Sequence, residues 1–194
     1  MPRDYSNFEI FLNELISDIY TQPEDPGHGG LTLNILNKWL PKILGNKTVI
    51  DMGCGQIAPQ DVFERNGMAY TGVAIGEDVI VAKAQGKNVL NMDMTFTEFG
   101  DESFDMVYSR HSLEHSPFPL LTLMEWHRVA KFHLLLVLPS PAAYGYVGKN
   151  HYGVMNNEQA RFFLERVGWQ VIWDDVSERS ELRYFCAKTK RHEI

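Results

Sequence analysis

The chain of 194 residues is 44% hydrophobic and 22% charged, and its formal net charge is −7. These values predict one globular domain with a substantial core, and they leave little chain for a second domain. The acidic balance and the lack of any block of Lys or Arg argue against DNA or RNA as a partner.

The cysteine count and the hydropathy pattern indicate the cellular compartment in which the protein is expected. The two cysteines, Cys54 and Cys186, lie far apart in the sequence and have no metal-ligand spacing, so both are expected to be reduced thiols. No signal peptide opens the chain, and the longest apolar run, Leu134–Leu138, is far too short to span a bilayer. We therefore expect a cytoplasmic protein with no membrane contact.

Two amphipathic helices are predicted at the start of the chain. Apolar side chains recur at helical spacing between Phe8 and Ile19, and a second stretch of this kind covers Leu31–Ile43. Thr21–Gly30 between them is rich in Pro and Gly and is predicted to be a loop. We interpret residues 1–45 as an N-terminal helical cover packed on the domain; a helix that binds a partner is the alternative.

Strand-like and helix-like stretches alternate over residues 46–190, which predicts an α/β core with a mostly parallel sheet and helices on both faces. The last two strands have no helix between them, so they should pair antiparallel at one edge of the sheet. The predicted strands are Thr48–Asp51, Ala69–Ile75, Asn88–Leu90, Phe104–Ser109, Phe132–Leu138, Gln170–Trp173 and Arg183–Ala187. The predicted helices are Pro59–Arg65, Glu77–Gln85, Pro119–Ala130 and Asn157–Val167.

The first strand of this core ends in a glycine turn that is typical of a nucleotide-binding βαβ unit. Gly53 and Gly55 allow a tight turn and a close approach of another molecule to the backbone, but the third glycine of the dinucleotide fingerprint is missing. With Asp51 ahead of the glycines, the stretch resembles the first motif of the class I methyltransferases that use S-adenosylmethionine (SAM). The resemblance implies that Asp51, Gly53, Cys54 and Gly55 bind the methionine end of SAM. A turn in which Asp51 caps neighbouring amides is the alternative.

The second motif departs from the family pattern. Where the family has an acid that binds both ribose hydroxyls, this chain has Ala74, followed by Ile75, at the end of the second strand. Losing that contact costs about 1.5–3 kcal/mol, so we expect weaker SAM binding or another ribose contact. Glu77 or Asp78 would reach the ribose, or would only be favourable charges at a helix N-terminus.

Two further stretches match the family. By resemblance, Asp93 accepts a hydrogen bond from the adenine amino group and the amide of Met94 meets a ring nitrogen; a turn aspartate is the alternative. Asp101–Val107 resembles the D-x-S-F-D-x-V stretch that leads into the fourth strand of the family, in which Asp105 is expected to order a turn.

The segment after the fourth strand, Ser109–His115, faces cofactor and substrate in this family, and its Leu-Glu-His ending is typical of the small-molecule branch. The resemblance implies that Arg110 contacts the cofactor. His111 is a candidate general base, because an imidazole titrates near neutral pH, and His115 is expected to bond to the backbone. We predict no metal site here, since the spacing His-x-x-Glu-His is not the zincin order and a helix would not aim all three side chains at one point.

The long segment Pro139–Val154 follows the fifth strand and is rich in Gly and Pro. Loops of this length more often have a function than serve only as connections. By resemblance, His151 and Tyr152 border the substrate pocket, with His151 as a second candidate catalytic residue. An ordered lid with exposed tyrosines is the alternative.

These motifs occur in the family order over most of the chain, so residues 1–194 are interpreted as one Rossmann-like methyltransferase domain, monomeric or dimeric. The resemblance implies transfer of a methyl group from SAM to an oxygen or nitrogen of a small molecule or sugar. One alternative is a non-catalytic binding or regulatory protein that has lost the ribose-binding acid. Another is a nucleotide-dependent oxidoreductase, which the missing third glycine argues against.

Overall fold

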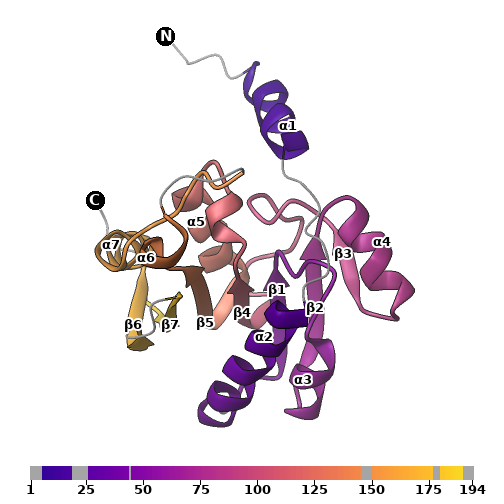
Figure 1. Ribbon diagram of the computed structural model, residues 1–194, viewed down its shortest axis with the longest axis vertical. Coiled ribbons are helices and arrows are strands. Elements are labelled where there is room, and N and C mark those ends of the chain that lie inside the picture. The colour runs from indigo at the N-terminus through magenta and orange to yellow at the C-terminus, as the bar shows by residue number, and fades with distance from the viewer. Residues whose placement is uncertain (1–5, 19–25, 44, 146–149, 177–179, 190–194) are drawn as a thin grey trace.

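The computed structural model describes residues 6–18, 26–43, 45–145, 150–176 and 180–189. Its centre is a seven-stranded sheet with the strand order β3-β2-β1-β4-β5-β7-β6 (Figure 1). The strands are β1 (Thr48–Met52), β2 (Ala69–Ala74), β3 (Val89–Asn91), β4 (Phe104–Arg110), β5 (Ala130–Pro139), β6 (Trp169–Asp175) and β7 (Glu181–Lys188). β1 to β5 run parallel, and β7 is antiparallel to both of its neighbours. The predicted Rossmann-like sheet with its reversed C-terminal strand is thereby confirmed.

Helices cover both faces of this sheet (Figure 1). On one face are α2 (Pro26–Trp39), α3 (Gln60–Arg65) and α4 (Glu77–Ala84), and on the other are α5 (Pro119–Val129) and α7 (Asn157–Val167). The helix α1 (Phe8–Asp18) stands away from both faces, and the remaining elements are α6 (Pro141–Tyr144) and the 3-10 turns η1 (Leu40–Lys42) and η2 (Leu113–His115). In the described parts of the chain, none of these helices combines the length and apolar character that a bilayer crossing needs.

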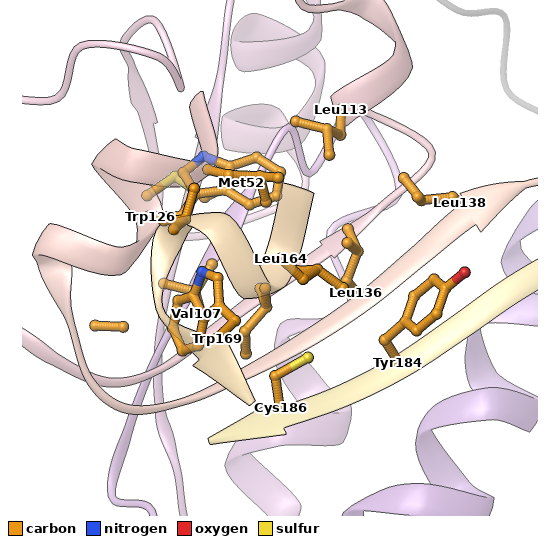
Figure 2. Close-up of a cluster of buried hydrophobic side chains, with 14 of the residues drawn as sticks. Met52, Val107, Leu113, Trp126, Leu136, Leu138, Leu164, Trp169, Tyr184 and Cys186 are labelled. Atoms are coloured by element: carbon orange, nitrogen blue, oxygen red, sulfur yellow. The ribbon is translucent and has the colours of Figure 1, made fainter. Parts of the chain in front are cut away.

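The side chains of the central strands alternate between two hydrophobic clusters, as the period of two in a strand requires. Val49 belongs to the cluster that also contains Trp39 of α2 and Phe63 of α3. The next residue, Ile50, belongs to the cluster that contains Trp126 of α5 and Leu164 of α7. Figure 2 shows this second cluster between α5, α7 and the strands. Burial on both faces explains why the neighbours Val49 and Ile50, which face opposite sides of β1, are both apolar.

Two predicted loops contain helix. Residues 26–30 form the first turns of α2, although the sequence is rich in Pro and Gly. Pro26 occupies the first helical position, where its missing N–H costs nothing, and burial of Leu36 and Trp39 against the sheet stabilises the helix. The remainder of the Thr21–Gly30 prediction, residues 21–25, lies outside the described residues. After β5, the short helix α6 begins directly beyond Ser140, whose side chain accepts a hydrogen bond from the amide of Ala142.

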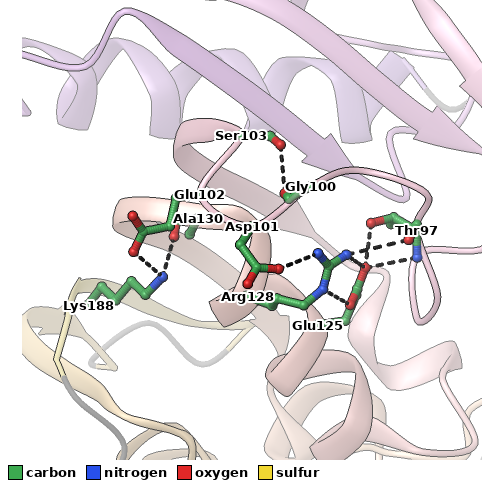
Figure 3. A network of polar contacts seen from close by, with 9 residues as sticks. All are labelled: Thr97, Gly100, Asp101, Glu102, Ser103, Glu125, Arg128, Ala130 and Lys188. Carbon is green, nitrogen blue, oxygen red and sulfur yellow. Dashed lines mark hydrogen bonds and ion pairs between the residues drawn. The ribbon is translucent and has the colours of Figure 1, made fainter.

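A polar network fixes the segment that follows β3 (Figure 3). The guanidinium of Arg128 at the end of α5 donates to both oxygens of Glu125 at 2.7 and 2.8 Å and to Asp101 at 2.8 Å. Glu125 in turn accepts hydrogen bonds from the backbone amide and the hydroxyl of Thr97. This network holds residues 97–101 against α5, and residues 92–95, shortly before them, reach the site described below.

Candidate functional site

A pocket lies at the carboxyl ends of the parallel strands, beside the point between β1 and β4 where the strand order reverses. This is the position at which open α/β sheets bind their ligands. Its lining comes from α1 (Leu12 and Ile16), the turn after β1 (Gly53 and Gly55), β2 and α4 (Val73, Ala74, Ile75 and Asp78), the segment after β3 (residues 92–95) and the segment after β4 (His111, Ser112, His115, Ser116 and Pro117).

The two glycines after β1 have different roles. Gly53 has a φ of +76°, and a Cβ there would lie 2.3 Å from the Cβ of Ser112. Gly55 has a φ of +59°, but the nearest atom to an added Cβ is an oxygen of Asp78 at 4.0 Å. Gly53 is therefore required by the packing of the chain, whereas Gly55 leaves its backbone open to a ligand in the pocket. This open cradle fits a cofactor that lies against the backbone of the turn.

Three other residues predicted to contact the cofactor are not among those that line the pocket. Asp51 is 2% exposed, and its Oδ2 accepts a hydrogen bond of 2.8 Å from the hydroxyl of Tyr70. Burial raises the pKa of Asp51 to about 7, although the Tyr70 bond lowers it. Burial also raises the pKa of the Cys54 thiol well above its usual value. Arg110 pairs with Glu181, at 2.7 Å between Nη2 and Oε1.

The buried carboxyl of Asp51 gives a first prediction: Asp51→Asn should raise the free energy of unfolding at pH 8 and change it far less at pH 4. Because the pKa of about 7 in the folded protein exceeds the ordinary 3.8, the folded state binds more protons between these values, and stability falls as the pH rises through this window. The gain at pH 8 has an upper bound of about 4 kcal/mol. Urea unfolding at both pH values measures it. An equal effect at pH 4 and pH 8 would contradict the buried, proton-binding carboxyl.

Acidic side chains lie on the side of the pocket that is formed by α4 and by the segment after β3. Ala74 and Ile75 line it at the end of β2, and Asp78 lines it from the first turn of α4. Gln56 donates a hydrogen bond of 2.9 Å to Oδ1 of Asp78, whose pKa is raised by burial. Asp93 also lines the pocket, and its Oδ1 accepts the amide of Thr95 at 2.8 Å. Asp78 therefore supplies a carboxylate near the position at which the sequence has only Ala74.

The imidazole of His111 lies at the pocket and is held by a buried acid at the start of β7. His111 has a φ of +51°, and its Nε2 lies 3.0 Å from Oε1 of Glu181. Glu181 is 1% exposed and also accepts hydrogen bonds from Arg110 and Arg183. Burial would raise the pKa of Glu181, but the His111 bond and the neighbouring positive charges hold it at about 2. Sequence reasoning missed Glu181, which follows its partner Arg110 by 71 residues.

The rings of His115 and His151 lie next to each other. His115 lines the pocket, and its Nδ1 lies 3.0 Å from the carbonyl oxygen of Asn150, which confirms the expected backbone bond. The ring centroids of His115 and His151 are 4.8 Å apart, and His151 is not among the residues that line the pocket. Burial lowers the pKa of His115 to about 4 and raises the pKa of the adjacent Glu114 to about 8.

The helix α1 borders the pocket from the N-terminal part of the chain. Leu12 and Ile16 are part of the lining. Phe8 packs its ring against Phe96 and Phe118, at centroid distances of 6.0 and 5.8 Å. Periodicity predicted this helix but not that its apolar stripe would contact the site.

Comparisons with known proteins find similarity to methyltransferases. Residues 50–136 match a family described as a methyltransferase domain, and no curated protein matches the chain. A SAM-dependent methyltransferase from Archaeoglobus fulgidus superposes with a TM-score of 0.68 at 20% identity, over 82% of this chain and 94% of that one. Magnesium protoporphyrin IX methyltransferase from Synechocystis PCC 6803, with bound SAM, gives 0.66 at 19% identity over 96% and 95%.

A third structure is a complex of the Haloferax volcanii Trm112 methyltransferase activator and a methyltransferase, which gives 0.67 at 17% identity over 81% of this chain and 90% of that one. At these identities the structures establish the fold, and the match of residues 50–136 to the methyltransferase-domain family agrees with it. The chain therefore has the fold of the class I, SAM-dependent methyltransferases.

Proposed function

We propose that the protein is a SAM-dependent methyltransferase that methylates an oxygen or nitrogen of a small molecule or sugar. The observation that carries the proposal is the pocket at the switch point of the sheet, where the open backbone of Gly55 and the carboxylates of Asp78 and Asp93 face one cavity. The match of residues 50–136 to the methyltransferase-domain family, and the SAM bound in the Synechocystis structure of the same fold, support SAM as the cofactor.

We assign each part of SAM to groups in the pocket or next to it. The turn of Gly53, Cys54 and Gly55 receives the methionine end, and Asp51 near the end of β1, in its charged form, attracts the ammonium group. Asp78 takes the place of the missing ribose-binding acid. Around the adenine, Asp93, Met94 and Ile75 supply one carboxylate and two apolar side chains.

The chemistry needs alignment and removal of one proton. When bound, SAM supplies a methyl group on a positively charged sulfur, so the protein has to hold the acceptor atom in line with the methyl–sulfur bond. His111 lies at the pocket and takes the proton of the acceptor. The carboxylate of Glu181 orients its imidazole and stabilises the positive charge that forms on it. His151 lies behind His115 and acts through it rather than on the acceptor.

The ribose contact gives a second prediction. Asp78→Asn should weaken SAM binding about tenfold or more, because a charge-assisted hydrogen bond to a hydroxyl is lost. Ala74→Asp introduced into the Asp78→Asn protein should recover most of this loss, since it restores an acid at the end of β2. Glu77→Gln is the matched control, because Glu77 is exposed on the same helical turn and does not line the pocket. Calorimetry measures all four affinities, and equal losses for Asp78→Asn and Glu77→Gln would disprove the ribose role.

Turnover tests the enzymatic part of the proposal. The purified chain is incubated with SAM and a panel of small hydroxylated and amino compounds, and release of S-adenosylhomocysteine is measured. We expect turnover with at least one acceptor, and His111→Ala should lose turnover while it keeps SAM affinity. The rival, a non-catalytic binding protein, is favoured by the absence of an acid at Ala74. SAM binding without turnover on any acceptor would support that rival.

A further inference from the structure

Three potential metal ligands meet at the wall of the cofactor pocket, to which His115 belongs. Glu114 and His115 come from the 3-10 turn η2, and His151 comes from the segment after α6. One carboxylate oxygen of Glu114 and one ring nitrogen of each histidine all lie within 4.8 Å of one another. His111 does not belong to this group, because its Nε2 lies beside Glu181. The set therefore differs from the His-x-x-Glu-His run in the sequence.

The surrounding backbone already orients these ligands. The carbonyl of Asn150 accepts the Nδ1–H of His115 at 3.0 Å, which leaves Nε2 of this histidine as the ligand atom. Metal-binding histidines almost always donate their other ring N–H in this way. The carbonyl of Glu114 accepts the amides of Tyr152 and Gly153 at 2.8 and 2.9 Å. These bonds hold the two segments that carry the ligands against each other.

Buried polar atoms at the same place lack a partner. Glu114 is 1% exposed, and its Oε2 has no hydrogen-bond partner among the described residues. The side-chain amide of Asn150, which is 5% exposed and adjacent to His151, is also unsatisfied at both its nitrogen and its oxygen in the described part of the chain. Buried carboxylates are normally paired or bound to a metal. An ion between Glu114 and the histidines satisfies the first of these groups.

We propose that Glu114, His115 and His151 bind one Zn²⁺ ion in the wall of the cofactor pocket. Two imidazole nitrogens and one carboxylate oxygen suit zinc, whereas Mg²⁺ and Ca²⁺ prefer oxygen ligands alone. Zinc bonds of about 2.0–2.2 Å place tetrahedral ligand atoms about 3.3 Å apart, so the ligands close by small side-chain rotations. The fourth position is left for water or for a group of the acceptor. Metal binding itself does not depend on the proposed methyl transfer.

Zinc titration of the full chain tests this site in the absence of SAM. The protein is stripped with a chelator, and Zn²⁺ is titrated in competition with a chromophoric chelator. We expect one Zn²⁺ per chain and a rise in Tm that saturates at one equivalent. Glu114→Gln and His151→Ala should each weaken binding about tenfold or more. His133→Ala is the matched control, because His133 is a half-buried histidine that pairs with Asn46, and its affinity should equal that of the wild type.

Cobalt substitution keeps the test decisive if a variant is unstable. Co²⁺ in the wild-type protein should give the visible absorption bands of a tetrahedral site, and one equivalent of Zn²⁺ should remove them. Absence of saturable Zn²⁺ binding by the wild type would overturn the proposal. So would equal affinities of wild type, His151→Ala and Glu114→Gln, since the ion would then be bound elsewhere. Either result leaves the SAM-dependent function untouched, because that function is measured by SAM titration.

Discussion

Gly53→Ala is expected to abolish SAM binding and to lower the free energy of unfolding by about 2–5 kcal/mol. Two costs add: the φ of +76° is a left-handed conformation, and the new Cβ would lie 2.3 Å from the Cβ of Ser112. Ser112 cannot move away from this Cβ without breaking hydrogen bonds, because its hydroxyl donates to the carbonyl of Met52 at 2.7 Å and pairs with the hydroxyl of Ser109. Relief of the clash therefore requires the turn itself to move, and this is the turn to which we assign the methionine end of SAM.

Gly67→Ala separates the clash from the backbone strain. Gly67 has a nearly identical φ of +78°, but no atom lies within 4 Å of an added Cβ. This control should lose only about 1–2 kcal/mol and should keep SAM binding. Urea unfolding and calorimetric titration of both variants give the comparison. Equal losses in the two variants would mean that the contact between Gly53 and Ser112 has no energetic importance.

Glu181→Gln should lower the free energy of unfolding by about 3–5 kcal/mol, because it leaves buried positive charges without their partner. The carboxylate accepts hydrogen bonds from Arg110 and from Arg183, whose side chain is 5% exposed, and it lies 3.0 Å from His111. Turnover should fall as well, since the imidazole of His111 loses the group that orients it. Glu165→Gln on the exposed side of α7 is the control and should change stability by less than about 0.5 kcal/mol.

The same carboxylate sets a pH dependence. The pKa of Glu181 in the folded protein is about 2, below its ordinary value of 4.5. Its stabilising contribution is therefore complete above pH 4.5 and is lost as the pH falls toward 2. Between these values the wild type should lose stability faster than Glu181→Gln. Parallel acid-unfolding curves for the two proteins would show that the carboxylate is not held in its charged form.

Much of the fold could be predicted because local signals and burial agree. Helix α7 was predicted with its observed bounds, since Asn156 and Gln159 form a capping box and Gly168 ends the helix in the left-handed conformation. The apolar runs of the strands likewise predicted the sheet, and the lack of a helix between the last two strands predicted the reversed strand. That reversed strand, β7, lies between β5 and β6 and not at the edge of the sheet. The prediction of a loop at residues 26–30 was wrong. The Pro/Gly composition of this stretch favours a loop, but burial of Leu36 and Trp39 stabilises the helix α2 that begins at Pro26.

Site residues at the ends of strands could be predicted from the sequence. Contacts between residues that are far apart in the sequence could not. Ala74 ends β2 and Asp93 follows β3, so their places at the pocket could be predicted from the sequence. The pairing of Arg110 with Glu181 spans 71 residues, and the bond of His115 to Asn150 spans 35. No local pattern encodes such contacts, because they arise from the antiparallel placement of β7 and from the packing of the segment after α6 on η2.

The most direct test of the account is calorimetric titration of the purified, ligand-free chain with SAM and with S-adenosylhomocysteine, with NAD as the comparison. We expect saturable one-to-one binding of both sulfur compounds in the micromolar range and no binding of NAD. No binding of either sulfur compound at millimolar concentration, or preferential binding of NAD, would contradict this expectation. In either case the fold would serve another ligand and the enzymatic proposal would be abandoned.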